Sequence, residues 1–121
     1  MTFEEADLAR IAAAEEIEIE TTSAGGQTHR TIIWAVVADG IIRVRSVNGP
    51  GARWYREATA NPNVAIDLDG QRWPARAIPA SGPADVEACN AGLRQKYAHD
   101  PSLRAMLAPS ILDTTLRLEP A

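Results

Sequence analysis

Two Asp-Gly pairs constrain the fold of this chain more than any other feature. Asp39-Gly40 and Asp69-Gly70 each lie between two segments rich in β-branched and apolar residues. An Asp-Gly pair in that setting predicts a two-residue hairpin turn, because both central residues of the favoured turn need positive φ angles. Strands joined by so short a turn pair antiparallel, since a parallel pair needs a crossover of about a dozen residues or more. The chain is therefore expected to build an antiparallel sheet.

The remaining pattern predicts six strands and three or four short helices. Residues 16–21 alternate between glutamate and apolar or threonine side chains, which is typical of a half-buried strand. The expected strands are residues 16–21, 28–38, 41–46, 64–68, 71–78 and 114–119. The expected helices lie after a capping box formed by Thr2 and Glu5, at residues 52–60, from Pro83 to Tyr97, and briefly after Pro101.

Six antiparallel strands with a few helices favour a small closed β-barrel, which leaves no exposed sheet edge. The length of 121 residues leaves room for a single domain, residues 1–121. Pro74 lies inside the fifth expected strand and lacks the N–H that a central ladder position donates. That strand is therefore expected at an edge or at a bulge.

Charge and composition exclude several classes of function. The net charge of −4 argues against nucleic acid as the main partner, and no apolar run reaches the roughly 18 residues that a membrane span needs. The acidic N-terminus lacks the basic region of a secretory signal, so a cytoplasmic protein is expected. Cys89 is the single cysteine, which excludes an internal disulfide and a cysteine-based metal site. No metal site is expected.

The loop that begins at residue 47 has the composition of an anion site. Residues 28–56 carry five arginines and one carboxylate, Asp39, which indicates a small anionic ligand. Gly49 and Gly51 permit close approach of the backbone, and the loop leads into a helix whose first amides lack intrahelical partners. Arg53 in the first turn is a cation where the helix dipole prefers an anion, which fits a bound phosphate group.

The order of these motifs resembles that of a known superfamily. It runs from Gly26 through the polar strand start at residues 28–31 and the first Asp-Gly turn to Arg45-Ser46-Val47-Asn48-Gly49, and then through Arg53-Trp54-Tyr55 to Asn61-Pro62. This order of motifs resembles that of the FMN-binding split-barrel proteins related to pyridoxamine-phosphate oxidase. It is most similar to the deazaflavin-dependent nitroreductase-like branch and to a small bacterial family of unknown function. Residues 22–26 lack the basic residue usual in the nitroreductase-like branch, so FMN and a deazaflavin coenzyme both stay open.

The resemblance implies a six-stranded split barrel of Greek-key type that works as a homodimer and binds FMN or a deazaflavin coenzyme. It also implies a set of cofactor-binding residues, and Arg72, Trp73 and Arg76 lie where the later strand of the family contributes contacts from the second subunit. The set is His29, Arg30, Thr31, Ile32, Ile33, Ser46, Val47, Asn48, Gly49, Arg53, Trp54, Trp73 and Arg76. It names no catalytic residue, because the cofactor itself carries the electron or hydride chemistry.

Three functions are consistent with this sequence. The first is an oxidoreductase acting on a small organic molecule, the second a non-catalytic flavin or anion carrier, and the third a cofactor-free interaction dimer. The ordinary interpretation of several residues is structural: Arg43 and Arg45 on a solvated or interface strand face, His29 at a strand end, Cys89 in the core. The three tryptophans are expected in the core or at an interface, with at most one near a ring.

Overall fold

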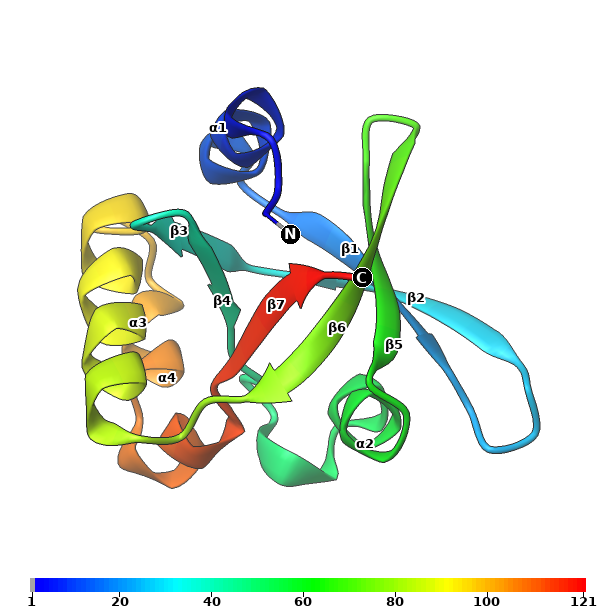
Figure 1. Ribbon diagram of the computed structural model, residues 1–121. Helices are drawn as coiled ribbons and strands as arrows, with labels where there is room; N and C mark the ends of the chain where they lie inside the picture. The colour runs from blue at the N-terminus through cyan, green and yellow to red at the C-terminus, as the bar shows by residue number, and fades with distance from the viewer. Residues whose placement is uncertain (1) are drawn as a thin grey trace.

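A computed structural model describes residues 2–121 and shows a barrel with helices outside it (Figure 1). The sheet is antiparallel throughout, in the order β2-β1-β5-β6-β7-β4-β3. In chain order the elements are α1 (Glu5–Ala13), β1 (Ile17–Thr22), β2 (Thr28–Ile33), β3 (Ala35–Ala38), β4 (Ile41–Val44), η1 (Gly49–Gly51), α2 (Arg53–Ala60), β5 (Asn63–Leu68), β6 (Gln71–Pro79), α3 (Pro83–Lys96), α4 (Leu103–Met106), η2 (Pro109–Thr114) and β7 (Leu116–Pro120).

Both Asp-Gly hairpins are confirmed. β3 pairs with β4 and β5 pairs with β6, each antiparallel. The turn residues have positive φ angles, 54° at Asp39, 75° at Gly40, 52° at Asp69 and 81° at Gly70. Positive φ at both central residues matches the right-handed twist of the flanking strands. The local turn chemistry therefore sets the register of two strand pairs, β3 with β4 and β5 with β6.

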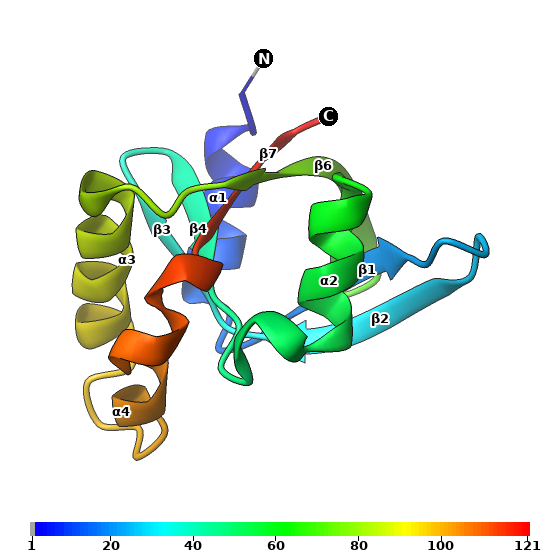
Figure 2. The same ribbon diagram turned by 90° about the horizontal axis from the view of Figure 1, so that it is seen from below.

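The strand count is seven, where the sequence predicted six. The expected strand at residues 28–38 is interrupted at Trp34, so that β2 pairs with β1 while β3 pairs with β4. These two halves lie at opposite ends of the strand order, and Trp34 joins them covalently. The chain thereby passes from one edge strand to the other, and the sheet curls round into a barrel (Figure 2). The fold class is otherwise as expected, a mainly β, antiparallel split barrel.

The expectation that Pro74 marks an edge strand or a bulge is wrong, because β6 lies between β5 and β7. The reason is the short length of β7. The last paired residue is Pro120, opposite Ala75, and beyond it the N–H of Ala121 donates to the carbonyl of Pro74. Pro74 therefore faces the very end of β7, where a missing N–H removes no bond from the middle of the ladder.

The barrel interior forms the main core. Alternate residues of the strands point inward, and α1 and α2 add Ile11, Trp54 and Ala58. Helix α1 begins at Glu5 without a side-chain hydrogen bond at its N-cap, Glu4, so the predicted Thr2 capping box does not form. The buried strand residues of this core are Ile17, Ile19, Ile33, Ala35, Ile42, Val44, Val64, Ile66, Trp73, Ala75, Ala77, Leu116 and Leu118.

A second, smaller core lies outside the barrel, where α3 and α4 pack beside β3 and β4 (Figure 1). Cys89 and Leu93 of α3 are buried here. This layer corrects the interpretation of Arg43 and Arg45 as a solvated or interface strand face, because α3 covers both and their exposed fractions are 7% and 2%. Asp85 at the start of α3 accepts hydrogen bonds from Arg43, which explains how α3 can cover a strand face that carries arginines.

No helix within residues 2–121 combines the length and the apolar character required for a membrane crossing.

Candidate functional site

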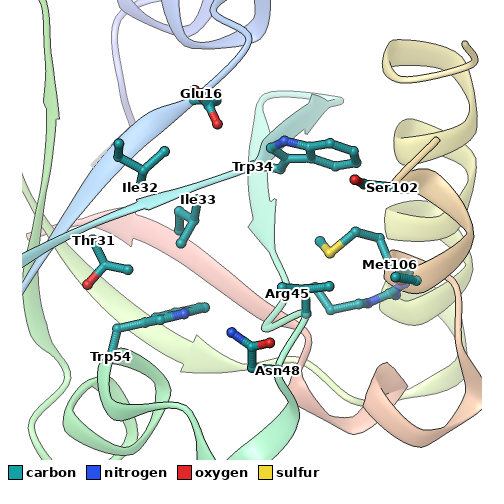
Figure 3. A pocket seen from close by; sticks show the side chains of 12 residues that line it. Glu16, Thr31, Ile32, Ile33, Trp34, Arg45, Asn48, Trp54, Ser102 and Met106 are labelled. Carbon is teal, nitrogen blue, oxygen red and sulfur yellow. The ribbon is translucent and has the colours of Figure 1, made fainter. Parts of the chain in front are cut away.

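A cavity of about 310 Å³ opens beside the point where the barrel closes (Figure 3). Its walls come from the end of β2, the loop after β4, the first turn of α2 and the region of α4. Most of the lining is apolar, with a tryptophan at each of two sides. The lining residues are Glu16, Thr31, Ile32, Ile33, Trp34, Arg45, Val47, Asn48, Trp54, Ser102, Ala105 and Met106.

The loop after β4 is shaped by hydrogen bonds of its own residues. Ser46 Oγ donates to the carbonyl of Gly49 over 2.7 Å, and the N–H of Gly49 donates to the carbonyl of Ser46 over 3.0 Å. Gly49 has a φ of 78°, a conformation that favours glycine. Thr114 Oγ1 accepts the N–H of Ser46 over 3.0 Å. The loop is thus fixed at its base, and its tip residues Val47 and Asn48 reach the cavity.

The rim of the cavity is apolar and open to water. Within residues 2–121, the large hydrophobic side chains that stand out as exposed are Ile32 at 62% and Val47 at 46%, and both line this cavity. Apolar area left in water is unfavourable by roughly 25 cal/mol per Å², so covering it would stabilise a complex. The rim is therefore suited to contact an apolar ligand or a second protein chain.

The cavity gathers six of the residues expected from the sequence. They are Thr31, Ile32, Ile33, Val47, Asn48 and Trp54. Ser46 and Gly49 lie in the adjoining loop and hold its shape. Ser46 is 1% exposed, and Gly49 is buried as well. Trp73 belongs to the barrel core, 7% exposed, with Arg10 over its ring at 5.4 Å. Arg76 is exposed on β6, opposite Glu119 in the sheet register.

The basic residues of β2 are engaged by carboxylates. His29 Nδ1 lies 3.1 Å from both carboxylate oxygens of Glu57 in α2. Arg30 points to the opposite side of β2, where it lies 3.4 Å from Glu20 and 3.5 Å from Asp67. Neither His29 nor Arg30 lines the cavity. The alternation of side chains along a strand explains why neighbours in sequence end on different faces.

Arg45 lines the cavity but is buried with its donors engaged by the protein, and Arg53 is the exposed basic residue next to the cavity. Its Nη2 donates to Thr31 Oγ1 over 3.4 Å, and Thr31 lines the cavity. Its Nε lies 4.0 Å from Glu57 Oε1, a longer separation than that between Glu57 and His29. The side chain of Arg53 is half exposed, so it can reorient toward a ligand at the cavity mouth.

Glu57 stays ionised in this arrangement. The hydroxyl of Thr21, which is fully buried, donates to Glu57 Oε1 over 2.7 Å. This hydrogen bond is the main cause that lowers the pKa of Glu57, with smaller contributions from His29 and Arg53, while burial acts in the opposite direction. The carboxylate therefore holds His29 and leaves Arg53 as the cation with the weaker ion pair.

Six cavity residues lie outside the cofactor-binding set expected from the sequence, although Trp34 and Arg45 belong to the two segments whose backbone was expected near the ring. The six are Glu16, Trp34, Arg45, Ser102, Ala105 and Met106. Three of these come from the α4 region, which reaches the barrel only through tertiary packing, and no local pattern indicates that contact. Trp34 carried a usable signal, since a large aromatic residue in the middle of a strand of β-branched residues can mark a break.

The curled antiparallel sheet, with its two edge strands joined at Trp34, gives the chain a split-barrel fold. Solved structures of this fold match the chain over most of its length at low identity. The conserved hypothetical protein Rv2991 from Mycobacterium tuberculosis is 16% identical with a TM-score of 0.71, covering 100% of this chain and 81% of that one. An F420-H2 dependent reductase, FDR-A, is 17% identical with a TM-score of 0.66, covering 87% of this chain and 94% of that one. HutZ, the heme storage protein from Vibrio cholerae, is 14% identical with a TM-score of 0.68, covering 100% and 92%.

Residues 7–118 match the family described as "Uncharacterized protein conserved in bacteria (DUF2255)". The chain belongs to this family. No curated protein matches the sequence. Within residues 2–121, no group of three or more histidine, cysteine, aspartate or glutamate side chains is placed to hold a metal ion.

Proposed function

We propose that this protein binds a flavin, FMN in the first place, in the cavity beside Trp34, and that it is an oxidoreductase acting on a small organic molecule. The observation that carries the proposal is the combination of an apolar cavity of about 310 Å³ with an arginine at its edge. A planar ring suits the apolar walls, and a phosphate group suits Arg53. Fold neighbours named as an F420-H2 dependent reductase and an F420 reductase support a cofactor of the flavin or deazaflavin kind.

The ring part and the phosphate part of such a cofactor fit the described residues to different degrees. Val47 offers most of the apolar surface to a ring, and the largely buried Ile33 and Trp54 add a small part. For a phosphate group, the Thr31 hydroxyl, the Asn48 amide and the Arg53 guanidinium form the donor set. The other expected donors are committed elsewhere: Ser46 to Gly49, His29 to Glu57, and Arg30 to Glu20 and Asp67.

A bound flavin would supply the electron or hydride transfer, and the chain supplies binding, orientation and exclusion of water. Thr31 and Asn48 would orient the cofactor by hydrogen bonds from two different walls, while Trp54 and Met106 restrict water on two sides. A deazaflavin coenzyme is the alternative occupant. A carrier that binds the same ring without turnover is the alternative function, and the name of HutZ, a heme storage protein, supports storage on this fold.

The proposal includes a homodimer. A cavity of about 310 Å³ open on one side covers only part of a tricyclic ring with its side chain. A second subunit placed over Ile32 and Val47 would bury the apolar rim and complete the wall. Trp73 is buried within its own barrel, so a contribution from a second subunit would come from exposed residues such as Arg76.

Replacement of Arg53 by alanine tests the phosphate assignment. We expect the variant to bind FMN about tenfold more weakly, since a hydrogen bond to a charged group contributes roughly 1.5–3 kcal/mol and this arginine is half exposed. Riboflavin carries the same ring without phosphate and should bind Arg53→Ala and wild type equally. The measurement is a fluorescence titration with each compound.

The matched control is Arg94→Ala, which removes an exposed arginine of α3 far along the chain from the cavity. It should bind both compounds like the wild type. An unchanged FMN affinity in Arg53→Ala would remove the phosphate role from this residue. An equal loss for FMN and riboflavin would show that Arg53 acts on the ring site or on folding.

A further inference from the structure

Trp34 separates two hollows of the molecule. On one side it lines the cavity described above. On the other side its ring stacks on Tyr97 of the α3 C-terminus, with centroids 3.8 Å apart and planes inclined by 7°. Tyr97 lines a neighbouring surface hollow together with Lys96 and His99, and it does not line the cavity. One face of the indole is therefore covered by Tyr97, and the indole also lines the cavity, which Tyr97 does not reach.

The stacked pair is held in place by hydrogen bonds to the backbone around Trp34. Tyr97 Oη donates to the carbonyl of Glu15 over 2.7 Å, and burial raises the pKa of this hydroxyl to about 12, so it remains a donor at neutral pH. Lys96 Nζ donates to the carbonyl of Ala35, the residue after Trp34, over 2.6 Å. Lys96 at the end of α3 and Tyr97 directly after it thus hold the segment where the barrel closes.

Figure 3 shows Trp34 and Trp54 on different sides of the cavity, with Ile33 between them along the wall. Trp54 is 6% exposed and packs in the barrel core, so little of its indole is left to meet a ligand. Trp34 lies outside both core clusters and packs only against the edge of the second. Trp34 is only partly buried, so of the two tryptophans it is the more accessible, and Tyr97 supports one face of its ring.

We infer that the indole of Trp34 is the stacking surface for a planar aromatic ring in this cavity, and that Tyr97 is the positioning residue that orients it. The inference rests on the proposed function and adds the residue that recognises the ring. Aromatic rings prefer offset-stacked geometry, and the Trp34–Tyr97 pair offers a preformed platform for a third ring. Stacking contacts the ring and not the phosphate group, so it would recognise any flavin by its ring system.

The test compares riboflavin and FMN binding by the full chain and its Trp34 and Tyr97 variants. Trp34→Leu should weaken riboflavin and FMN by the same factor, about tenfold, as expected for loss of one aromatic stack. It should also restore part of the ligand fluorescence, because an indole in van der Waals contact quenches a bound flavin. Trp34→Phe, which keeps a smaller ring, should fall between wild type and Trp34→Leu in both measurements.

Tyr97 variants separate positioning from folding. Tyr97→Phe keeps the stack and should retain the quenching, whereas Tyr97→Leu removes the support of the indole and should weaken riboflavin about threefold with partial recovery of fluorescence. Circular dichroism and thermal melts identify the variants that fold. If Trp34→Leu does not fold, the test rests on Trp34→Phe, on its affinity for riboflavin and FMN and on the fluorescence of the bound flavin.

Wild-type affinity and full quenching in the folded Trp34 variants would overturn this inference and leave the proposed function intact. Failure of the wild type to bind riboflavin, FMN and a deazaflavin coenzyme would overturn the proposed function itself. Weaker FMN binding in Trp34→Leu with unchanged riboflavin binding would also contradict the stacking role of Trp34, because that pattern belongs to a phosphate contact.

Discussion

Replacement of Asp85 by alanine is expected to destabilise the protein by about 3 kcal/mol, because removal of one partner from a buried ion pair leaves an uncompensated charge. Asp85 Oδ1 accepts hydrogen bonds from Arg43 Nε over 2.9 Å and from Arg117 Nε over 2.8 Å. Arg43 is only 7% exposed, so without Asp85 its guanidinium would be buried beside another cation. For a chain of this size the melting temperature should fall by about 10 °C.

A control variant and the pH dependence show whether the loss of stability comes from the Asp85 ion pairs. Glu87→Ala, in the same helix, removes a pair with Arg94 whose side chains are 70% and 57% exposed, and its melting temperature should change little. Hydrogen bonds from Arg117 and Arg43 lower the pKa of Asp85 below 3.8. The folded protein therefore binds fewer protons there than the unfolded chain, so the stabilisation is present above pH 3.8 and is lost as pH falls through the folded-state pKa. Asp85→Ala melting as high as wild type at pH 7 would contradict the account.

Replacement of Arg45 by alanine is the second large effect, again about 3 kcal/mol. Arg45 is 2% exposed and ties three elements together. Its Nε donates to Thr115 Oγ1, its Nη1 to Asn90 Oδ1 and the carbonyl of Met106, and its Nη2 to the carbonyl of Val86. Loss of the side chain would remove a donor from each of these acceptors and open a void beside the cavity. Thermal unfolding measures the effect.

Arg45→Met distinguishes the hydrogen bonds from the volume. The partners of Arg45 are all neutral, and burial lowers the pKa of its guanidinium, so the buried charge itself is unfavourable. Methionine fills much of the volume without a charge and should be less destabilising than alanine, by about 1 kcal/mol or more. If the alanine variant is as stable as wild type, Arg45 does not tie α3 and α4 to the barrel.

The sequence predicted the strands and turns well because their information is local. The Asp-Gly pairs specify turn geometry by themselves, and alternation specifies which strand face is buried. The break at Trp34 was missed since residues 28–38 are uniformly suited to a strand, and what interrupts them is the bending of the barrel and the stack on Tyr97, 63 positions away. Pro74 was misjudged for a related reason, because the length of β7 is not visible from β6.

The arginines show why the surroundings of a site residue could not be predicted from the sequence. Arg43, Arg45 and Arg53 look alike in sequence, as basic residues near one loop. The structure gives them three different surroundings: a buried ion pair, a buried set of neutral acceptors and the edge of a cavity. The surroundings of Arg43 and Arg45 depend on where α3 and α4 pack, and those of Arg53 depend on how β2 and α2 meet.

The most direct test of the central claim is a fluorescence titration of the cofactor-stripped wild-type protein with FMN, and separately with a deazaflavin coenzyme. The account predicts saturable quenching by one of them at micromolar concentration or below, with one ligand bound per chain. Absence of binding by both, in a folded protein, would contradict the flavin proposal and leave the split barrel as the framework of an interaction dimer.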